Sequence, residues 1–507
     1  TAGDAQGAAN AFAKLLDDQL RILGPNHTDT LITRSNLAYW RGTTGDAQGA
    51  ANAFAELLDD RMRILGPDHP DTLATRSNLA RWRGTAGDAQ GAANAFAKLL
   101  DDQLRILGPN HTDTLITRGN LAHWRGEAGD TQGAADAYAE LLNDCLHILG
   151  PAHPDTFATR NNLASWRGTA GDAQGAADAY TELLNDCLHI LGPAHPDTLT
   201  TRSNLASWRG KAGDAQGAAD AYTELLDDRM RILGSTHPDT LTTRSSLASW
   251  RGTAGDAQGA ADAFAELLDD QLRILGPNHP DTLTTRNNLA HWRGEAGDTQ
   301  GAANATAELL NDQLRILGPN HTDTLITRGN LARWRGTAGD AQGAANAFAE
   351  LLDDQLRILG PNHPDTLIIR NNLAHWRGEG GDAQGAADAY AKLLDDRMRI
   401  LGPNHPDTLT TRNNLASWRG EAGDAQGAAD ATAELLNDQL RILGPDHPDT
   451  LTTRGNLGSW RGEAGDTQGA ADAYAKLLDD CLRILGSTHP DTLTTRNNLA
   501  SWRGKAG

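Results

Sequence analysis

The sequence repeats itself every 42 residues, and this period constrains the fold more than any other feature. A tryptophan recurs at the same place in twelve successive copies, from Trp40 to Trp502, and most other positions are identical between copies. A period of 20–50 residues is typical of solenoids, in which each unit packs only against its neighbours. We therefore predict a single solenoid over residues 1–507, with a long surface for binding rather than one deep pocket.

Each copy contains two segments with helical periodicity. In the first copy, apolar residues over residues 4–23 follow the i, i+3, i+4, i+7 spacing of one helix face. A second helix is predicted over residues 29–41, where we expect His27 to serve a structural turn and Gly42 to end the helix. No segment alternates polar and apolar residues as a strand would. The sequence thus predicts an all-α fold, an α-α solenoid of twelve 42-residue helix-turn-helix repeats.

Composition excludes several classes of function. The formal net charge of -21 disfavours nucleic acid and favours a basic or mixed-charge partner. No apolar run approaches the roughly 20 residues of a membrane helix, and no signal peptide is present, so we expect a cytoplasmic protein without membrane contact. Cys145, Cys187 and Cys481 share one repeat position, which we interpret as neutral variation at a tolerant site rather than a disulfide framework.

The copies resemble tetratricopeptide repeats, whose pattern is W-x2-L-G-x2-Y followed by A-x3-F. The leucine, the small residue and the A-x3-F element are kept, as Leu37, Ala38, Ala50 and Phe54. Arginines replace the two aromatic residues, at Arg34 and Arg41. The 42-residue length, the His-Pro-Asp-Thr-Leu segment and the Asn-Asn-Leu-Ala run are most similar to the kinesin light chain type. Similar arrays occur in the C-terminal sensor regions of bacterial signalling NTPases.

The resemblance implies a right-handed superhelix in which the helix over residues 29–41 is the first helix of a repeat, helix A. Helices A would line the concave wall, and the longer helices B would face outward. In this register residues 1–24 are an orphan helix B and residues about 490–503 an orphan helix A, so we expect a fragment of a longer protein. Scattered differences between copies favour natural duplication over a consensus design.

Four positions on the predicted helix A vary between copies, and in the first copy they are Ile32, Ser35, Tyr39 and Thr43. Their spacing places them on one helix face, which the resemblance puts on the concave wall. We favour a recognition surface, while neutral drift of an exposed face stays an alternative. The candidate residues at the last two positions are Tyr39, Arg81, His123, Glu127, Lys211, His291, Glu295, Arg333, His375, Glu379, Glu421 and Glu463.

A row of asparagines accompanies this face, interrupted by Ser246. The resemblance implies that these amides hydrogen-bond the backbone of a bound peptide, for which they offer both a donor and an acceptor. The alternative is a packing role between neighbouring repeats. The row consists of Asn36, Asn78, Asn120, Asn162, Asn204, Asn288, Asn330, Asn372, Asn414, Asn456 and Asn498.

No arrangement for catalysis, metal or cofactor binding stands out. The His-x-Asp segments recur once per repeat, too far apart to share a metal ion, and adjacent carboxylates such as Asp17 and Asp18 diverge on a helix. We instead expect Asp18 to pair with Arg21 or Arg34, and we expect Arg34 and Arg41 to point inward as a paired ladder. No phosphate-binding loop is present. The sequence predicts neither an enzyme nor a cofactor site.

Two hypotheses follow. The first is a non-catalytic scaffold or sensor module whose concave face binds a protein or an extended peptide. The second is a structural array, in which the exposed helix B face of one chain stacks on the exposed helix A face of the next to form a filament.

Overall fold

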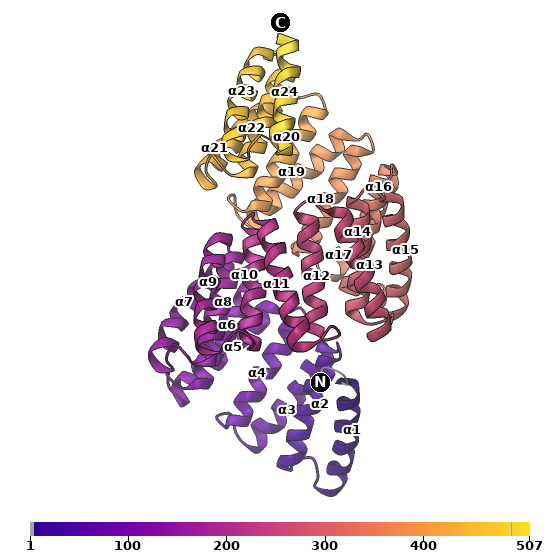
Figure 1. The fold of residues 1–507 in the computed structure, drawn as a ribbon. Helices are drawn as coiled ribbons and strands as arrows, with labels where there is room; N and C mark the ends of the chain where they lie inside the picture. Colours follow the sequence, from indigo (N-terminus) through magenta and orange to yellow (C-terminus); the bar gives the residue numbers. More distant parts are fainter. Residues whose placement is uncertain (1–4, 488, 507) are drawn as a thin grey trace. The chain divides into compact units, whose positions relative to one another are not determined.

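The computed structural model describes residues 5–487 and 489–506, which form 24 α-helices and no strand. The chain divides into two compact units, Thr1–Gly255 and Asp256–Gly507, each described here by itself. Within each unit, helices that follow one another in the sequence pack side by side (Figure 1). This arrangement confirms the predicted all-α fold and solenoid packing, while the prediction of one continuous solenoid stays a prediction.

The helices alternate in length between the odd-numbered and even-numbered members of each pair. In the first unit they are α1 (Ala5–Ile22), α2 (Thr28–Thr43), α3 (Ala47–Ile64), α4 (Pro70–Thr85), α5 (Ala89–Ile106), α6 (Thr112–Glu127), α7 (Thr131–Ile148), α8 (Pro154–Thr169), α9 (Ala173–Ile190), α10 (Pro196–Lys211), α11 (Ala215–Leu233) and α12 (Pro238–Thr253). In the second unit they are α13 (Ala257–Ile274), α14 (Pro280–Glu295), α15 (Thr299–Ile316), α16 (Thr322–Thr337), α17 (Ala341–Ile358), α18 (Pro364–Glu379), α19 (Ala383–Ile400), α20 (Pro406–Glu421), α21 (Ala425–Ile442), α22 (Pro448–Glu463), α23 (Thr467–Ile484) and α24 (Pro490–Ala506). Among the described residues, no helix combines the length and the apolar character that a membrane crossing requires.

Polar side chains start the helices of both kinds. His27 is the N-cap of α2, and its Nδ1 accepts a hydrogen bond from the backbone N–H of Asp29 at 3.2 Å. Asp46 caps α3 by accepting a hydrogen bond from the backbone N–H of Gly49 at 2.8 Å. Both caps satisfy an N–H group that has no partner inside the helix. The predicted structural role of the recurrent histidine is confirmed.

The expectation that Gly42 ends its helix is wrong. The helix continues to Thr43, and the chain turns at Gly45, whose φ is +101°. Gly42 is needed for packing instead, because a Cβ atom there would lie 2.4 Å from Cη2 of Trp82 in the next even helix. The same contact recurs in both units, for example between Gly126 and Trp166.

The core is divided into separate clusters, each built around one odd helix. In the cluster around α3, Ala50, Phe54 and Leu57 are completely buried, and they pack with Leu31 from α2 and Trp82 from α4. Each cluster therefore needs three successive helices, and burial of apolar surface stabilises the stack only when neighbouring repeats are in place.

Within each unit, ion pairs join even helices to the odd helices that follow them. Arg34 donates to Asp60 at 2.6 Å, and equivalent pairs of 2.5–2.8 Å occur in both units. Asp18 pairs with Arg21 at 2.8 Å. These contacts confirm the predicted pairing of Asp18 and of Arg34. The expectation that Arg41 points inward is wrong, because this residue is exposed in the last turn of α2.

Substituting two glycines of α6 separates close packing from helix propensity. Gly126→Ala should destabilise the protein by about 1–3 kcal/mol, because its Cβ overlaps the ring of Trp166. Gly119→Ala should stabilise it by up to about 1 kcal/mol, because the nearest atom, Cδ2 of Leu141, is 3.5 Å away and alanine favours the helix. Urea unfolding measures both changes, and equal effects would contradict the packing role of Gly126.

Protonation of the ion-paired aspartates should weaken the fold in acid. Hydrogen bonds from Arg34 and then Arg63 lower the pKa of Asp60 below its ordinary value. A carboxylate with a lowered folded-state pKa stabilises the fold above its unfolded pKa of about 3.9, and this stabilisation is lost as the pH falls through the folded-state pKa.

Asp60→Asn should therefore be less stable than the parent near pH 7, and the difference should shrink toward zero as the pH falls below 4. The control is Asp59→Asn, because Asp59 is exposed and the structure records no ion pair for it among the described residues. Urea midpoints across this pH range give the comparison. A difference between parent and Asp60→Asn that stays constant with pH would exclude the linkage.

Candidate functional site

The variable positions of the predicted helix A gather around three hollows between neighbouring even helices. We use the name even-helix face for the surface of these helices that carries the positions of Asn36, Tyr39 and Thr43. A hollow of about 620 Å³ between α6, α8 and α10 includes His123, Glu127, Asn162, Asn204 and Lys211 in its lining. A hollow of about 640 Å³ between α18 and α20 includes Asn372, His375, Glu379, Asn414 and Glu421, and another of about 640 Å³ between α20 and α22 includes Glu421, Asn456 and Glu463.

The other predicted site residues lie outside these three hollows. Asn78 lines a hollow between α4 and α6, and Asn498 lines one between α22 and α24. The remaining predicted residues line none of these five hollows, and they are Asn36, Tyr39, Arg81, Asn120, Asn288, His291, Glu295, Asn330 and Arg333. The structure thus brings a subset of the predicted residues together, in short runs of adjacent repeats.

The variable side chains control how much of each tryptophan is exposed. Arg333 lies 4.6 Å from the ring centre of Trp334, and Lys211 lies 4.0 Å from that of Trp208. Cations cover Trp82 and Trp502 in the same way. These four indoles are the buried ones, with 3–8% of their surface exposed, whereas the other described tryptophans are half-buried. A cation over an indole is attracted by the ring quadrupole and shields it from solvent.

In each of the three hollows one indole that follows a serine and has no cation over it stays half-buried, whereas Trp208 and Trp502, which also follow serines, are covered by lysines. Trp166, Trp418 and Trp460 line the three hollows beside Ser165, Ser417 and Ser459, respectively. A histidine at this position packs beside the indole without covering it as a cation does. The ring of His123 lies edge-on to Trp124 and Trp166, with ring centres 5.0 and 5.9 Å apart. The even-helix face therefore carries both covered and uncovered indoles.

The asparagine row forms hydrogen bonds between repeats in some copies. Asn204 donates from Nδ2 to Oδ1 of Asn161 at 2.8 Å, and Asn330 and Asn456 form equivalent bonds at 3.0 Å. Asn162 and Asn498 donate instead to tyrosine hydroxyls at 3.5 Å. The packing role of the row is present in these copies, and its role toward a bound peptide stays a prediction.

Buried tyrosines complete the floor of two hollows. Tyr180 donates to the backbone oxygen of Asn161 at 2.9 Å, and Tyr390 donates to that of Asn371 at 3.1 Å. Burial raises the pKa of Tyr180 and of Tyr390 to about 12, so both hydroxyls remain protonated donors at neutral pH. These rings hold the base of each hollow rigid.

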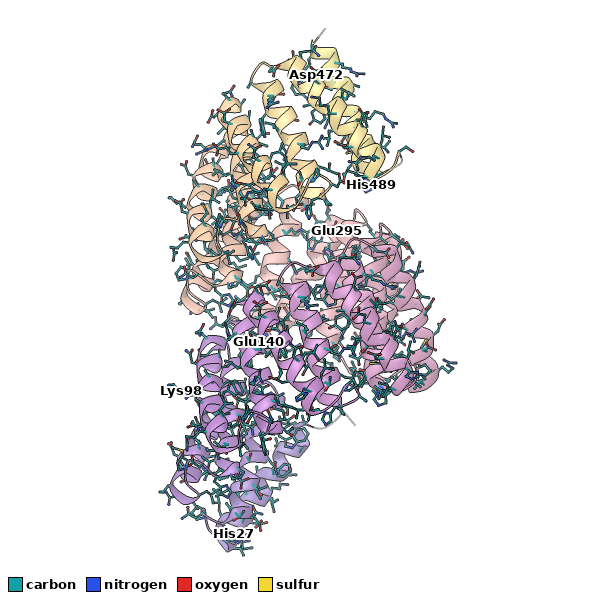
Figure 2. All side chains as sticks on the ribbon, turned by 90° about the vertical axis from the view of Figure 1, so that its left-hand side faces the viewer. His27, Lys98, Glu140, Glu295, Asp472 and His489 are labelled. Carbon is teal, nitrogen blue, oxygen red and sulfur yellow. The ribbon has the colours of Figure 1, made fainter. Side chains whose placement is uncertain are left out.

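Charge differs between parts of the face. Glu379, Glu421 and Glu463 follow one another on three successive even helices, and Glu463 is paired with Lys505 at 3.5 Å. Glu295, labelled in Figure 2, accepts a hydrogen bond from Arg333 at 2.5 Å. Burial, followed by the charge of Arg333, lowers the pKa of His291, which is therefore neutral at pH 7.

The titratable groups do not assemble into a catalytic or metal-binding arrangement within the described ranges. There, no group of three or more His, Cys, Asp or Glu side chains is placed to hold a metal ion. Burial raises the pKa of the Cys145 thiol, which disfavours a nucleophilic thiolate. The repeated histidines use Nδ1 as helix caps.

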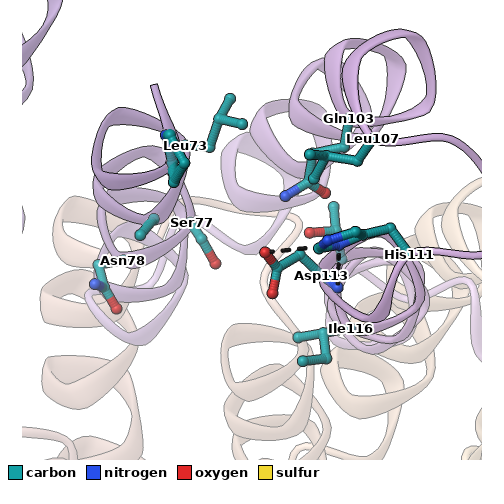
Figure 3. A pocket seen from close by; sticks show the side chains of 11 residues that line it. Leu73, Ser77, Asn78, Gln103, Leu107, His111, Asp113 and Ile116 are labelled. Atoms are coloured by element: carbon teal, nitrogen blue, oxygen red, sulfur yellow. Dashed lines mark hydrogen bonds and ion pairs between the residues drawn. The ribbon is translucent and has the colours of Figure 1, made fainter. Parts of the chain in front are cut away.

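Sequence reasoning missed a further hollow and the residue that lines its base. A hollow of about 400 Å³ lies between α4, α5 and α6, with Gln103 in its lining (Figure 3). Gln103 occupies the same repeat position as Arg61 and Cys145, and all three side chains are buried. The interpretation of this position as a tolerant site did not anticipate that burial. The available signal was the exchange of three residue types of different size and charge on the apolar stripe of one helix.

Family models of the tetratricopeptide repeat match the chain in several places. One model matches residues 197–270, and a second matches residues 30–71, 72–113, 324–365, 366–407, 408–449 and 450–491. Together these ranges cover more than half of the chain. Each 42-residue range contains an even helix and the odd helix that follows it, and the assignment of the even helices as helices A stays a prediction. No curated protein matches the sequence.

Solved structures with similar folds include three helical repeat proteins. A putative kinesin light chain from Podospora anserina with nearly identical repeats is 23% identical over 40% of this chain and 97% of its own, with a TM-score of 0.36. BtubC (BKLC) from P. vanneervenii is 20% identical over 46% of this chain and 94% of its own, with a TM-score of 0.38. Yeast Tom70 is 11% identical over 94% of this chain and 96% of its own, with a TM-score of 0.45.

The helix pairs, their contacts and the matched ranges agree on the unit of this architecture. The repeat is an even helix followed by an odd helix, joined by an arginine–aspartate pair and stacked through a tryptophan. The chain belongs to the tetratricopeptide-repeat family.

Proposed function

We propose that this chain is a non-catalytic protein-binding scaffold whose even-helix face holds an extended segment of a partner protein. Tetratricopeptide repeats form scaffolds suited to protein–protein interaction, and the family description names no enzymatic activity. The resemblance puts the even helices on the concave wall of the array. Its 42-residue type, similar to that of sensor regions in bacterial signalling NTPases, supports a sensor or scaffold role within a longer protein.

The observation that carries this proposal is the set of uncovered indoles in the three hollows. Half-buried Trp166, Trp418 and Trp460 present aromatic surface in spaces of about 620–640 Å³, large enough for one or two side chains of a bound segment. Aromatic residues are enriched in the energetic centres of protein interfaces. Asparagine amides beside them can hydrogen-bond a peptide backbone whatever its sequence.

The repeats themselves supply a variant that closes the hollows. In the parent chain Arg333 covers Trp334, whereas serines precede Trp418 and Trp460. Ser417→Arg combined with Ser459→Arg should cover both indoles with guanidinium groups. Selection of displayed random peptides on the parent chain, followed by calorimetry, should then give peptides whose affinity for this variant is at least about tenfold lower, as expected from losing a central aromatic contact.

A second variant changes the net charge equally on the odd helices. Glu350→Gln combined with Glu434→Gln removes two exposed carboxylates at the repeat position of Glu140, which projects from α7 (Figure 2). This variant should bind the selected peptides as the parent does. Equal loss of binding in both variants, or peptides that bind the serine-to-arginine variant unchanged, would exclude the even-helix face as the recognition surface.

A second candidate function is head-to-tail self-association of this chain. Leu15 on α1 and Leu493 on α24 are 44% and 49% exposed, whereas Leu57 and Leu451 at the same repeat positions are 0% and 6% exposed. The exposed leucines belong to faces that neighbouring repeats cover elsewhere in the array. Joining them would continue the stack in an open, non-closing assembly.

Sedimentation equilibrium over a wide concentration range tests this candidate. Self-association predicts an average mass that rises above 53.9 kDa with concentration, and Leu493→Asp should restore the mass of one chain because it places a charge in the contact. A mass that stays at 53.9 kDa throughout excludes the candidate.

A further inference from the structure

We propose that the hollow between α4, α5 and α6 is a pocket for a basic side chain, arginine or lysine, of the bound partner. The inference rests on the proposed function, because the pocket opens between two even helices beside the asparagine row, with Asn78 in its lining. It adds the chemistry of the partner, which the three indole hollows leave open.

The hollow combines apolar walls with acceptor groups. Its volume is about 400 Å³, and its lining includes Leu73, Leu107 and Ile116 together with the polar residues Ser77 and Asp113. The Ser77 hydroxyl and the Asp113 carboxylate point into the space between the helices (Figure 3). Ile116 is 48% exposed, so this wall is open to solvent and a side chain can enter along it.

A buried acceptor in this hollow has no donor. The Gln103 side chain is 4% exposed and its amide faces the hollow, where Oε1 accepts no hydrogen bond from any residue that the structure describes (Figure 3). Buried polar atoms in proteins are almost always hydrogen-bonded. Within the described part of the chain, the same oxygen is unpaired in Gln271, Gln313, Gln355 and Gln439, so this repeat position carries an acceptor without a donor where it is glutamine.

The chain itself places a guanidinium group at the equivalent point of other repeats. Arg61 occupies the repeat position of Gln103 and is 5% exposed. Its Nη1 donates to the backbone oxygen of Asp71 at 3.0 Å and to Oγ1 of Thr75 at 2.7 Å, and its Nη2 donates to the backbone oxygen of Leu31 at 3.4 Å. Arg229 and Arg397 donate from Nη1 to the corresponding aspartate and threonine, with distances of 2.6–3.1 Å.

The acceptors that hold this arginine line the hollow when glutamine replaces it. One repeat after Leu31, Asp71 and Thr75, the corresponding residues are Leu73, Asp113 and Thr117, and all three line the hollow beside Gln103. Glutamine is shorter than arginine and carries no charge, so it leaves this set of acceptors open to a cation from outside. The carboxylate of Asp113 and the net charge of -21 further favour a cation over an anion.

A second hollow follows the same rule with a different short residue. Between α22 and α24 a hollow of about 340 Å³ is lined by Leu451, Asp491 and Thr495, with Cys481 at the position of Gln103. Cysteine is also shorter than arginine. A short side chain at this repeat position thus accompanies an open hollow in these two places.

Methyl NMR of the full chain tests the pocket at a single site. With isotope-labelled isoleucine methyl groups, the Ile116 signal, assigned through Ile116→Val, is followed during titration with acetyl-arginine methylamide, acetyl-lysine methylamide and acetyl-norleucine methylamide. We expect a saturable shift with the arginine and lysine probes, and an affinity at least tenfold lower for norleucine, which has the stem without the charge. An equal response to norleucine would overturn the proposal.

Two substitutions taken from other repeats serve as matched variants. Gln103→Arg should fill the hollow as Arg61 does and abolish the Ile116 shift, whereas Gln103→Cys should keep it. Persistence of the shift in Gln103→Arg would overturn the pocket, as would its loss in Gln103→Cys. If either variant fails to fold, the comparison of the arginine and norleucine probes on the parent chain still tests the proposal.

The outcomes separate this inference from the proposed function. Peptides selected on the even-helix face that contain no basic residue, and bind Gln103→Arg as tightly as the parent, would exclude the basic pocket and leave the scaffold function intact. A saturable arginine response without any peptide bound by the even-helix face would support the pocket and exclude the proposed function.

Discussion

The contact between a tryptophan ring and the glycine one repeat earlier holds the even helices at a fixed spacing, and the rest of the structure depends on it. The ring of Trp82 lies directly on the backbone at Gly42, where no side chain would fit. Because the contact recurs, the variable side chains of successive even helices come into line, and the hollows open between them. The same residue thus sets the architecture and supplies the aromatic surface of the candidate binding face.

The surface of the even helices varies between copies while the contact that stacks the repeats stays the same. The residue before each tryptophan changes between tyrosine, arginine, histidine and serine, while the ring keeps its place on the glycine. A cation covers the indole, as at Trp334, and a serine leaves it open, as at Trp418. These side chains therefore change how much of the indole is exposed on the candidate binding face.

The buried guanidinium group of Arg61 is hydrogen-bonded to backbone and hydroxyl oxygens rather than to a carboxylate. Arg61 is buried with hydrogen bonds to backbone oxygens and to Thr75, and burial lowers its pKa. The same acceptors tolerate glutamine or cysteine, so exchange at this position changes the size of a hollow while the backbone stays in place. On the other side of the repeat, the Arg34–Asp60 pair joins helices A and B in a partly solvated setting, where protonation can weaken it.

The sequence by itself determined the helix pairs, their family, the histidine caps and the pairing of Arg34, because these depend on local spacing or on a motif repeated twelve times. Only the tertiary structure placed Gly42 inside its helix, exposed Arg41, and buried the position of Gln103. It also decided which indoles are covered. The packing of Gly42 is set by Trp82, 40 residues later, and a pattern read along one helix carries no information about which atoms the next repeat brings against it.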